Sequence, residues 1–354
     1  MKRLACHLLL ILALLPVVAA SCDSDGGAST LVDSDLAIID LQAGDDSGKI
    51  LGYLAHIYGH QINGSTISLL SSATIENTGA NAEDVIVEVQ IPGYTEKGRA
   101  SLLVPAHASA SVTNITPAFK FDQVYGVTTS AAANLEVTVV RGDATLALHS
   151  QPVTIEPVNR VLWYMKSGED LLDVRVLALT LITPDAPAVH TLLTEAAGYS
   201  RYGAMFGYQN LSDETVWDQV NAVWAAVQAR GVVYTSIPGS FFDGAQYVKL
   251  PKDSLQTGSA NCVDGTFLFA SAFEALGMEP VIVFLTSHVL MGVRMAPGSN
   301  RIIYLETTMV SSATLDDANT SGYNTVSGAT SDPQGIIFDL KKARGLGITP
   351  VNIR

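Results

Sequence analysis

The chain has 354 residues, enough for two domains by length alone, and its 34 acidic and 20 basic residues give a formal net charge of −14 at pH 7. This excess of negative charge argues against nucleic acid and against an anionic membrane surface as partners, because both bind clusters of Lys and Arg. No run of 18 apolar residues follows the first 21 residues, so we expect no later segment to span a membrane.

Residues 1–21 predict a secretory signal peptide. Two basic residues at positions 2 and 3 precede an apolar stretch, Leu8–Val18, that is too short for a stable membrane span. The next four residues, Ala19-Ala20-Ser21-Cys22, resemble the lipobox of bacterial lipoproteins. This resemblance implies that Cys22 is lipidated and anchors the protein in the cell envelope, whereas the alternative is ordinary cleavage near Ala20. Residues 22–31 are mostly small, polar and acidic, which predicts a flexible tether.

Residues 32–158 predict an all-β domain. Short alternating runs are separated by turn signals, and one run places four apolar side chains on one face, those of Val85, Val87, Val89 and Ile91. This spacing predicts an antiparallel β-sandwich. Residues 60–157 resemble bacterial immunoglobulin-like modules in their Asn-Thr-Gly turn and their later Val-Pro-Ala-His strand. Arg141-Gly142-Asp143 could be an adhesion motif, but we expect a tight hairpin turn.

Helical signals begin after residue 160, so we expect an α+β domain over residues 160–354. The strongest signal covers residues 212–231, where Ser212 is a natural N-cap and Trp217 and Trp224 are expected in the core. A shorter helix is expected over residues 183–197.

Cys262 is the only cysteine beyond residue 22. A lone buried cysteine is commonly an inert packing residue, because free Cys behaves as a small hydrophobe. Here, however, Cys262 opens the run 263–276, which is apolar on nearly every side and predicts a buried helix ended by Gly277. The free backbone N–H groups of a first helical turn favour a thiolate, the nucleophilic form of cysteine. The alternative interpretation is therefore a nucleophile.

His288 and Glu306 are placed to complete such a site. The apolar runs 280–286 and 301–308 predict strands, His288 opens the run between them, and Glu306 lies near the end of the second. Pairing in a hairpin would make the two side chains neighbours. A carboxylate on one imidazole nitrogen fixes the tautomer, while the other nitrogen takes the thiol proton.

This ordered set resembles the transglutaminase-like superfamily. The matching residues are Cys262 with Asp264 at a helix start, His288 before a strand, and Glu306 with Thr308 after the next strand. The resemblance is best over residues 210–310 and implies a papain-like core. It also implies that Cys262 is the nucleophile, His288 the general base and then acid, and Glu306 the orienting acid.

The sequence departs from the family pattern at three places. Glu306 stands where an Asp is usual, and its extra methylene moves the carboxylate without abolishing the pairing. Ser287 replaces a common Gly, and residues 289–291 lack the aromatic side chain that often follows the His. These changes concern the substrate cleft more than the three reacting groups.

An acyl-transfer site also needs hydrogen-bond donors for an oxyanion. The backbone N–H of Cys262 is one candidate. Gln256 is a second, because papain-like peptidases carry a Gln six residues before their nucleophile, and Gln246 is another; either could be an ordinary loop amide. We expect Asp264 to bond to backbone in the first helical turn and so to support the helix start.

We predict no cofactor and no metal. No Gly-rich phosphate loop precedes a helix, and His56 and His60 have the i, i+4 spacing of metal ligands only in a region that reads as sheet or loop. The sequence therefore predicts a cysteine peptidase or amidase that acts on a protein or peptide through an acyl-enzyme and touches the membrane only through its lipid. The alternatives are a cross-linking transglutaminase and an inactive binding lipoprotein.

Overall fold

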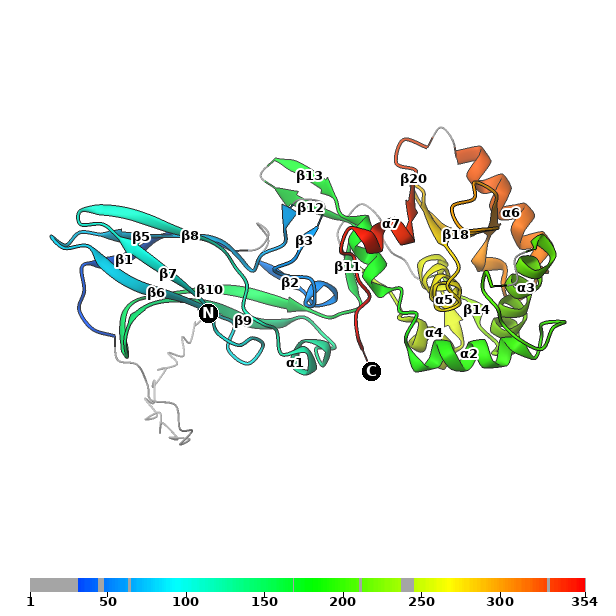
Figure 1. Cartoon of the computed structure of the whole chain (residues 1–354), viewed down its shortest axis with the longest axis horizontal. Coiled ribbons are helices and arrows are strands. Elements are labelled where there is room, and N and C mark those ends of the chain that lie inside the picture. Colours follow the sequence, from blue (N-terminus) through cyan, green and yellow to red (C-terminus); the bar gives the residue numbers. More distant parts are fainter. Residues whose placement is uncertain are drawn as a thin grey trace, which may run out of the picture.

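The computed structural model describes residues 31–43, 48–62, 65–167, 169–209, 212–236, 245–329 and 332–353. The predicted signal peptide, Cys22 and the tether up to residue 30 lie outside the described residues. The described chain is mixed α and β, with two sheets at one end of an elongated molecule and most of the helices at the other (Figure 1). Within these ranges, none of the helices has the length and apolarity to cross a membrane.

The N-terminal part contains two sheets. One has the order β1-β5-β8, with β1 at Leu36–Ala43, β5 at Leu70–Asn77 and β8 at Ala108–Ile115. The other has the order β2-β10-β9-β6-β7, with β2 at Lys49–Leu51, β6 at Glu83–Gln90, β7 at Gly98–Val104, β9 at Ala131–Arg141 and β10 at Ala144–Glu156. The pairings are antiparallel except that of β10 with β2. The pair β3 (Gln61–Ile62) and β4 (Ser65–Thr66) and the helix α1 (Phe121–Tyr125) are short additions.

The two sheets share one hydrophobic core. The predicted apolar face of β6 is confirmed, because the four side chains assigned to it, from Val85 to Ile91, are all buried. The predicted turn at Arg141-Gly142-Asp143 is confirmed as well. It joins β9 to β10, Arg141 pairs with Ala144, and Gly142 has a φ of 57°, which glycine adopts without strain.

The C-terminal part surrounds an antiparallel sheet of order β19-β18-β17-β20 with helices. Its strands are β17 (Pro280–Phe284), β18 (Val289–Arg294), β19 (Ile302–Leu305) and β20 (Ile336–Asp339). Its helices are η2 (Arg175–Leu181), α2 (Pro187–Ala197), α3 (Asp213–Ala229), α4 (Pro251–Thr257), α5 (Cys262–Ala275), η3 (Thr307–Met309), α6 (Leu315–Gly328) and α7 (Leu340–Gly345). Three short pairs complete it: β11 (Arg160–Leu162) with β15 (Ala245–Tyr247), β12 (Tyr164–Ser167) with β13 (Asp170–Asp173), and β14 (Val233–Tyr234) with β16 (Ser259–Ala260).

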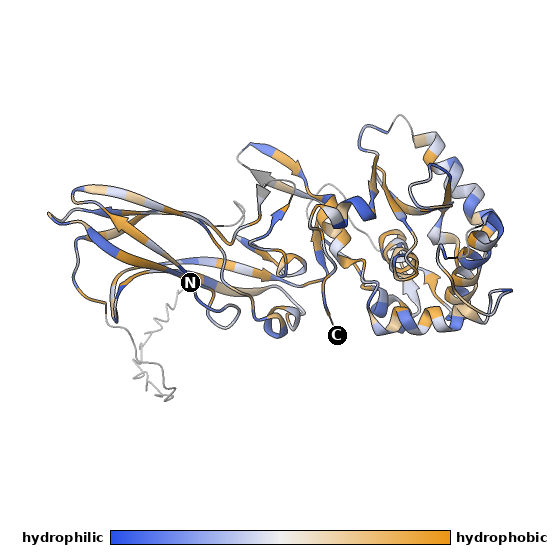
Figure 2. Ribbon diagram, in the orientation of Figure 1, coloured by the Kyte–Doolittle hydropathy of each residue, from blue (hydrophilic) through white to orange (hydrophobic). Residues whose placement is uncertain are grey.

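The helices predicted from periodicity and capping are confirmed. Ser212 caps α3 by accepting the N–H of Thr215 at 3.1 Å, and Trp224 is buried against the ring of Phe269 with centroids 5.4 Å apart. Trp217 is only half-buried. Helix α5 packs on β17 and β18 and is hydrophobic along most of its length, as Figure 2 shows.

The predicted boundary near residue 158 does not separate the two cores completely. β2 runs parallel to the last residues of β10, so the chain that follows β2, including η1 (Gly52–Leu54), reaches the C-terminal core. The side chains of Leu51, Tyr53 and Ile57 belong to that core. A parallel pairing between short segments about 100 residues apart leaves no local signal in the sequence.

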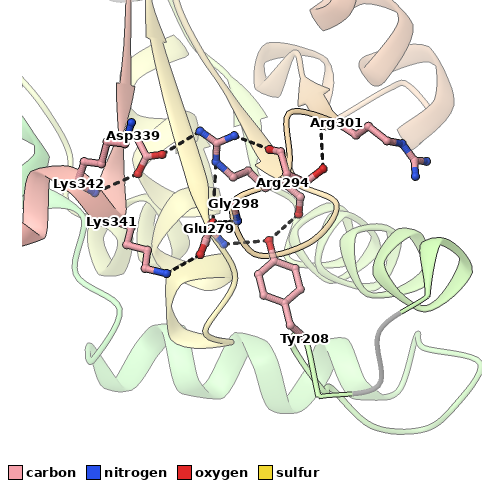
Figure 3. Close-up of polar contacts among 9 residues, drawn as sticks. Tyr208, Glu279, Arg294, Gly298, Arg301, Asp339, Lys341 and Lys342 are labelled. Atoms are coloured by element: carbon pink, nitrogen blue, oxygen red, sulfur yellow. Dashed lines mark hydrogen bonds and ion pairs between the residues drawn. The ribbon is translucent and has the colours of Figure 1, made fainter.

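A network of charges closes one end of the C-terminal sheet (Figure 3). Arg294 at the end of β18 donates to Asp339 at 2.8 Å, and Glu279 accepts from Lys341 and from the N–H of Gly298, each at 2.7 Å. Burial alone would raise the pKa of Glu279, but these two donors lower it. Because β17 and β18 form a hairpin, the turn before β18 lies at the opposite end of the sheet.

Candidate active site at the start of α5

Cys262 is the first residue of α5, and its position is fixed by a capping box. The side chain of Asn261 accepts the N–H of Asp264 at 2.9 Å, and Asp264 accepts the N–H of Asn261 at 3.1 Å. The thiol of Cys262 is half-buried. A first-turn position leaves its backbone N–H without an intrahelical acceptor, so this N–H is available to a ligand.

Asp264 holds a second segment against the helix start. Its side chain is fully buried, and Oδ1 accepts the backbone N–H of Lys249 at 2.8 Å. Burial raises the pKa of Asp264, and the bonds from Asn261 and Lys249 oppose this effect. The expected helix-start role of Asp264 is thus seen in the structure, where its carboxylate accepts backbone N–H groups on both sides of the turn.

The hairpins of the C-terminal sheet bring His288 to Glu306. His288 lies one residue before β18, Glu306 lies one residue after β19, and Met291 of β18 pairs with Leu305 of β19. The imidazole Nε2–H donates to Glu306 Oε2 at 2.7 Å. The neighbourhood expected from the hairpin is therefore present.

Glu306 is held by both of its carboxylate oxygens. Oε2 faces His288, while Oε1 accepts from the hydroxyl of Thr308 at 2.6 Å and from its N–H at 3.3 Å. Glu306 is buried and is the N-cap of η3. Burial alone would raise the pKa of Glu306, but the bonds from His288 and Thr308 lower it. The carboxylate is thus ionised and fixed in orientation.

Cys262 is the third group, and it lies near enough to His288 to act on the pKa of the imidazole. Burial alone would lower the pKa of His288, but side-chain hydrogen bonds to Cys262 and Glu306 raise it to about 9. Because Nε2 bonds to Glu306, Nδ1 is the ring nitrogen left to face the sulfur. A histidine that takes the proton of a neighbouring thiol, and whose imidazolium is then stabilised by a carboxylate, is the arrangement that activates a cysteine nucleophile.

The two glutamine candidates differ in their surroundings. Gln246 is buried in β15, and its Oε1 accepts from Trp163 Nε1 at 3.2 Å, which leaves the amide Nε2 as its donor. Gln256 is exposed near the end of α4. In the part of the chain that the structure describes, neither is hydrogen-bonded to Cys262.

Two residues near the site were not found from the sequence. The carboxylate of Asp332 accepts from the hydroxyl of Thr286 at 2.6 Å and from its N–H at 2.9 Å, so it holds the turn that leads into His288. Gly265 faces η3, where an added Cβ would lie 3.0 Å from Thr307 Oγ1. Both contacts join segments more than 40 residues apart, so no local sequence pattern could predict them.

The side chain of His56 is hydrogen-bonded to the backbone of a distant segment. Its Nε2 bonds to the carbonyl of Thr349 at 2.8 Å, and burial lowers its pKa. His60 is exposed in the turn that follows η1. Across the described ranges, no three His, Cys, Asp or Glu side chains gather in a way that could hold a metal ion.

No protein-family model matches the sequence, and no curated protein matches it. Among solved structures, the crystal structure of Amycolatopsis orientalis exo-chitosanase CsxA is similar at 10% sequence identity and a TM-score of 0.21. The match covers 58% of this chain, which spans only 28% of the chitosanase. A similarity this weak carries no argument about fold or activity, so the transglutaminase-like resemblance stays a prediction.

Proposed function

We propose that the chain is a thiol-dependent acyl-transfer enzyme that hydrolyses an amide or peptide bond of a protein or peptide substrate. The observation that carries the proposal is the hydrogen bond between His288 and Glu306, together with Cys262 at the start of a buried helix, near enough to His288 to act on the pKa of the imidazole. We extend the proposal to the fold, with an immunoglobulin-like sandwich followed by a papain-like, transglutaminase-like domain, and to an N-terminal lipid on Cys22.

The first half-reaction forms the acyl-enzyme. The Cys262 sulfur attacks the substrate carbonyl carbon, and its proton resides on His288 Nδ1. Glu306 stabilises the resulting imidazolium through Nε2 and prevents the ring from turning, since its own carboxylate is fixed by Thr308. His288 then gives its proton to the leaving nitrogen, the C–N bond breaks, and a thioester to Cys262 remains.

The second half-reaction regenerates the thiol. His288, now neutral, takes a proton from water, the resulting hydroxide attacks the thioester, and the carboxylic acid product leaves as the sulfur departs. An amine in place of water would give the cross-linking reaction. We favour hydrolysis because water is abundant.

Negative charge on the carbonyl oxygen needs donors in both half-reactions. The backbone N–H of Cys262 is one, because the helix leaves it unpaired. For the second we favour Gln246 over Gln256, since Gln246 is buried and oriented by Trp163 whereas Gln256 is exposed.

The decisive experiment measures alkylation of the full chain by iodoacetamide near neutral pH, with the modified residue identified by mass spectrometry. We expect labelling at Cys262 that falls when His288 is replaced by Ala. Cys262→Ser should abolish release of new N-termini or ammonia from a peptide mixture. A Cys262 that resists alkylation in the native state, with Cys262→Ser affecting only the melting temperature, would show that the thiol is a packing group.

The proposed anchor is tested independently of the chemistry. The intact mass of the mature protein should include a lipid on Cys22, and Cys22→Ser should move the protein into the soluble fraction. An unmodified N-terminus at another residue would contradict the anchor and leave the proposed chemistry untouched.

A further inference from the structure

The imidazole of His288 is carried by a short hairpin loop. The N–H of Leu285 donates to the carbonyl of His288 at 2.8 Å and closes the loop formed by residues 286 and 287 between β17 and β18. This bond directs the carbonyl of His288 toward β17. Successive strand residues direct their backbone groups to opposite edges, so the carbonyl of Val289 points toward β19, the neighbour of β18 on its other side.

Strand β19 offers this carbonyl no partner. The pairing of β18 with β19 ends at Met291 and Leu305. Continued by two residues, the same register would place Val289 opposite Thr307, but Thr307 is the first residue of η3. The break in the strand that lets Glu306 cap η3 therefore leaves the carbonyl of a fully buried residue without a ladder donor. Such a carbonyl needs another donor, because a buried acceptor without one is destabilising.

Thr266 supplies that donor from the helix that begins with Cys262. Its hydroxyl donates to the carbonyl of Val289 at 3.3 Å, and both residues are fully buried. Thr266 lies four residues after Cys262, so the two side chains are neighbours on one face of α5. The bond therefore joins this face to the residue that follows His288. Asp332 holds the loop before His288, so the histidine is fixed on both sides along the chain.

Gly265 allows the helix start to come this close. A Cβ at this position would lie 3.0 Å from Thr307 Oγ1 and 3.3 Å from Thr307 Cβ, so α5 packs directly on the first residue of η3. The same helix also packs on β18. The start of α5 thus lies where β18 and η3 diverge, and this position places the hydroxyl of Thr266 at the carbonyl that has no ladder donor.

We propose that Thr266 is a positioning residue of the candidate active site, whose hydrogen bond to Val289 sets the separation between the Cys262 sulfur and the His288 imidazole. A base takes a proton from a thiol only within hydrogen-bond reach, and displacements of about 1 Å slow enzymatic steps strongly. The inference rests on the proposed thiol chemistry and adds the group that aligns the thiol with its base.

The test removes the hydroxyl and keeps the shape of the side chain. Thr266→Val loses the donor, whereas Thr266→Ser retains it. Thr180→Val is the matched control, because Thr180 of η2 is also fully buried and its hydroxyl donates to the carbonyl of Leu177 at 2.9 Å. For each variant of the full chain we would measure the rate at which iodoacetamide alkylates Cys262, the pKa of His288 by NMR titration, and unfolding by denaturant.

We expect Thr266→Val to slow alkylation near neutral pH about two- to tenfold, the fold-change that corresponds to the net contribution of one hydrogen bond. The pKa of His288 should fall as well, because a displaced imidazole loses part of the effect of Cys262 and Glu306 that raises it. Thr266→Ser should restore most of the rate and of the pKa. Thr180→Val should destabilise the chain similarly and leave both quantities unchanged.

Three results would overturn the inference. An unchanged rate and pKa in Thr266→Val would show that the bond does not position His288. Equal effects in Thr266→Val and Thr266→Ser would assign them to packing and not to the hydroxyl. Equal slowing in Thr180→Val would show that any lost buried hydrogen bond loosens the site.

The titration separates this inference from the chemistry, since it needs no reactive thiol. If Cys262 of the unsubstituted chain resists alkylation, the proposed reaction fails. A fall in the pKa of His288 that is seen in Thr266→Val but not in Thr180→Val would still support the positioning role. An unchanged pKa in Thr266→Val would overturn that role whether or not Cys262 is reactive.

Discussion

Replacing Glu306 by Gln tests the charge arrangement around the thiol. Gln keeps the length and shape of the side chain but removes the negative charge that lies 2.7 Å from His288 Nε2. Burial opposes the imidazolium, and the bonds to Cys262 and Glu306 outweigh it, raising the pKa of His288 from 6.5 to about 9. We expect the pKa of His288 to fall in Glu306→Gln.

The magnitude follows from the two pKa values. A change from 6.5 to about 9 favours the imidazolium by about 3 kcal/mol, at 1.36 kcal/mol for each pKa unit. Cys262 supplies part of this effect, so removing the charge of Glu306 should cost the imidazolium on the order of 1 kcal/mol and no more than about 3 kcal/mol. The ratio of imidazolium to neutral imidazole should therefore drop several-fold or more at a given pH.

The same pair makes stability depend on pH. The folded-state pKa of His288 lies above its unfolded value, so its contribution to the free energy of unfolding is complete below pH 6.5 and is lost as the pH rises through about 9. The pKa of Glu306 is lowered, so its contribution is present above its ordinary value of 4.5 and is lost as the pH falls through the folded-state pKa. The difference between wild type and Glu306→Gln should be largest between these limits.

NMR titration of isotope-labelled histidine measures the pKa directly, with the His288 signal assigned by its loss in His288→Ala. Denaturant unfolding at pH 7 and pH 10 measures the stability difference. An unchanged pKa of His288 in Glu306→Gln, or an equal loss of stability at both pH values, would refute the reasoning.

Three further substitutions test the contacts around the thiol. Cys262→Ser removes the sulfur whose proximity raises the pKa of His288, so the same titration should show a lower pKa for this histidine; an unchanged value would mean that the thiol does not act on the imidazole in solution. Asp264→Asn leaves a buried backbone N–H without its acceptor, and denaturant unfolding should show a loss of about 1–3 kcal/mol; a loss within error would contradict the buried cap. Gly265→Ala places a Cβ 3.0 Å from Thr307 Oγ1, and this crowding of η3 against the start of α5 should slow alkylation of Cys262 several-fold. The melting temperature should be nearly unchanged, because Ala is the better helix former by about 1 kcal/mol. An unchanged alkylation rate would exclude a role for this close packing.

The parts of the site that could be predicted are those that depend on local rules. The apolar run after Cys262, the turn before it and the acid at position 264 define a capped, buried helix, and the structure contains that helix. The alternation of β17, β18 and β19 with short turns fixes their order, and this order is what brings His288 to Glu306.

The parts that could not be predicted depend on contacts between distant segments. Asp332 reaches Thr286 from beyond α6, and β2 reaches β10 across about 100 residues. Nothing in either segment specifies its partner. The exposure of the Val233 and Tyr234 side chains in β14 could not be predicted either, because two adjacent apolar residues give no sign of whether they are buried.

The glutamate at position 306 has a physical reason in this chain. β19 ends at Leu305 and η3 begins at Thr307, so residue 306 must both cap the short helix and reach the imidazole. Glu306 does this with its two oxygens, Oε1 toward Thr308 and Oε2 toward His288. An aspartate from the same Cα would reach about 1.5 Å less far and would have to give up one of these partners. A glutamate at position 306 can therefore keep its bond to His288 even though β19 is followed directly by η3.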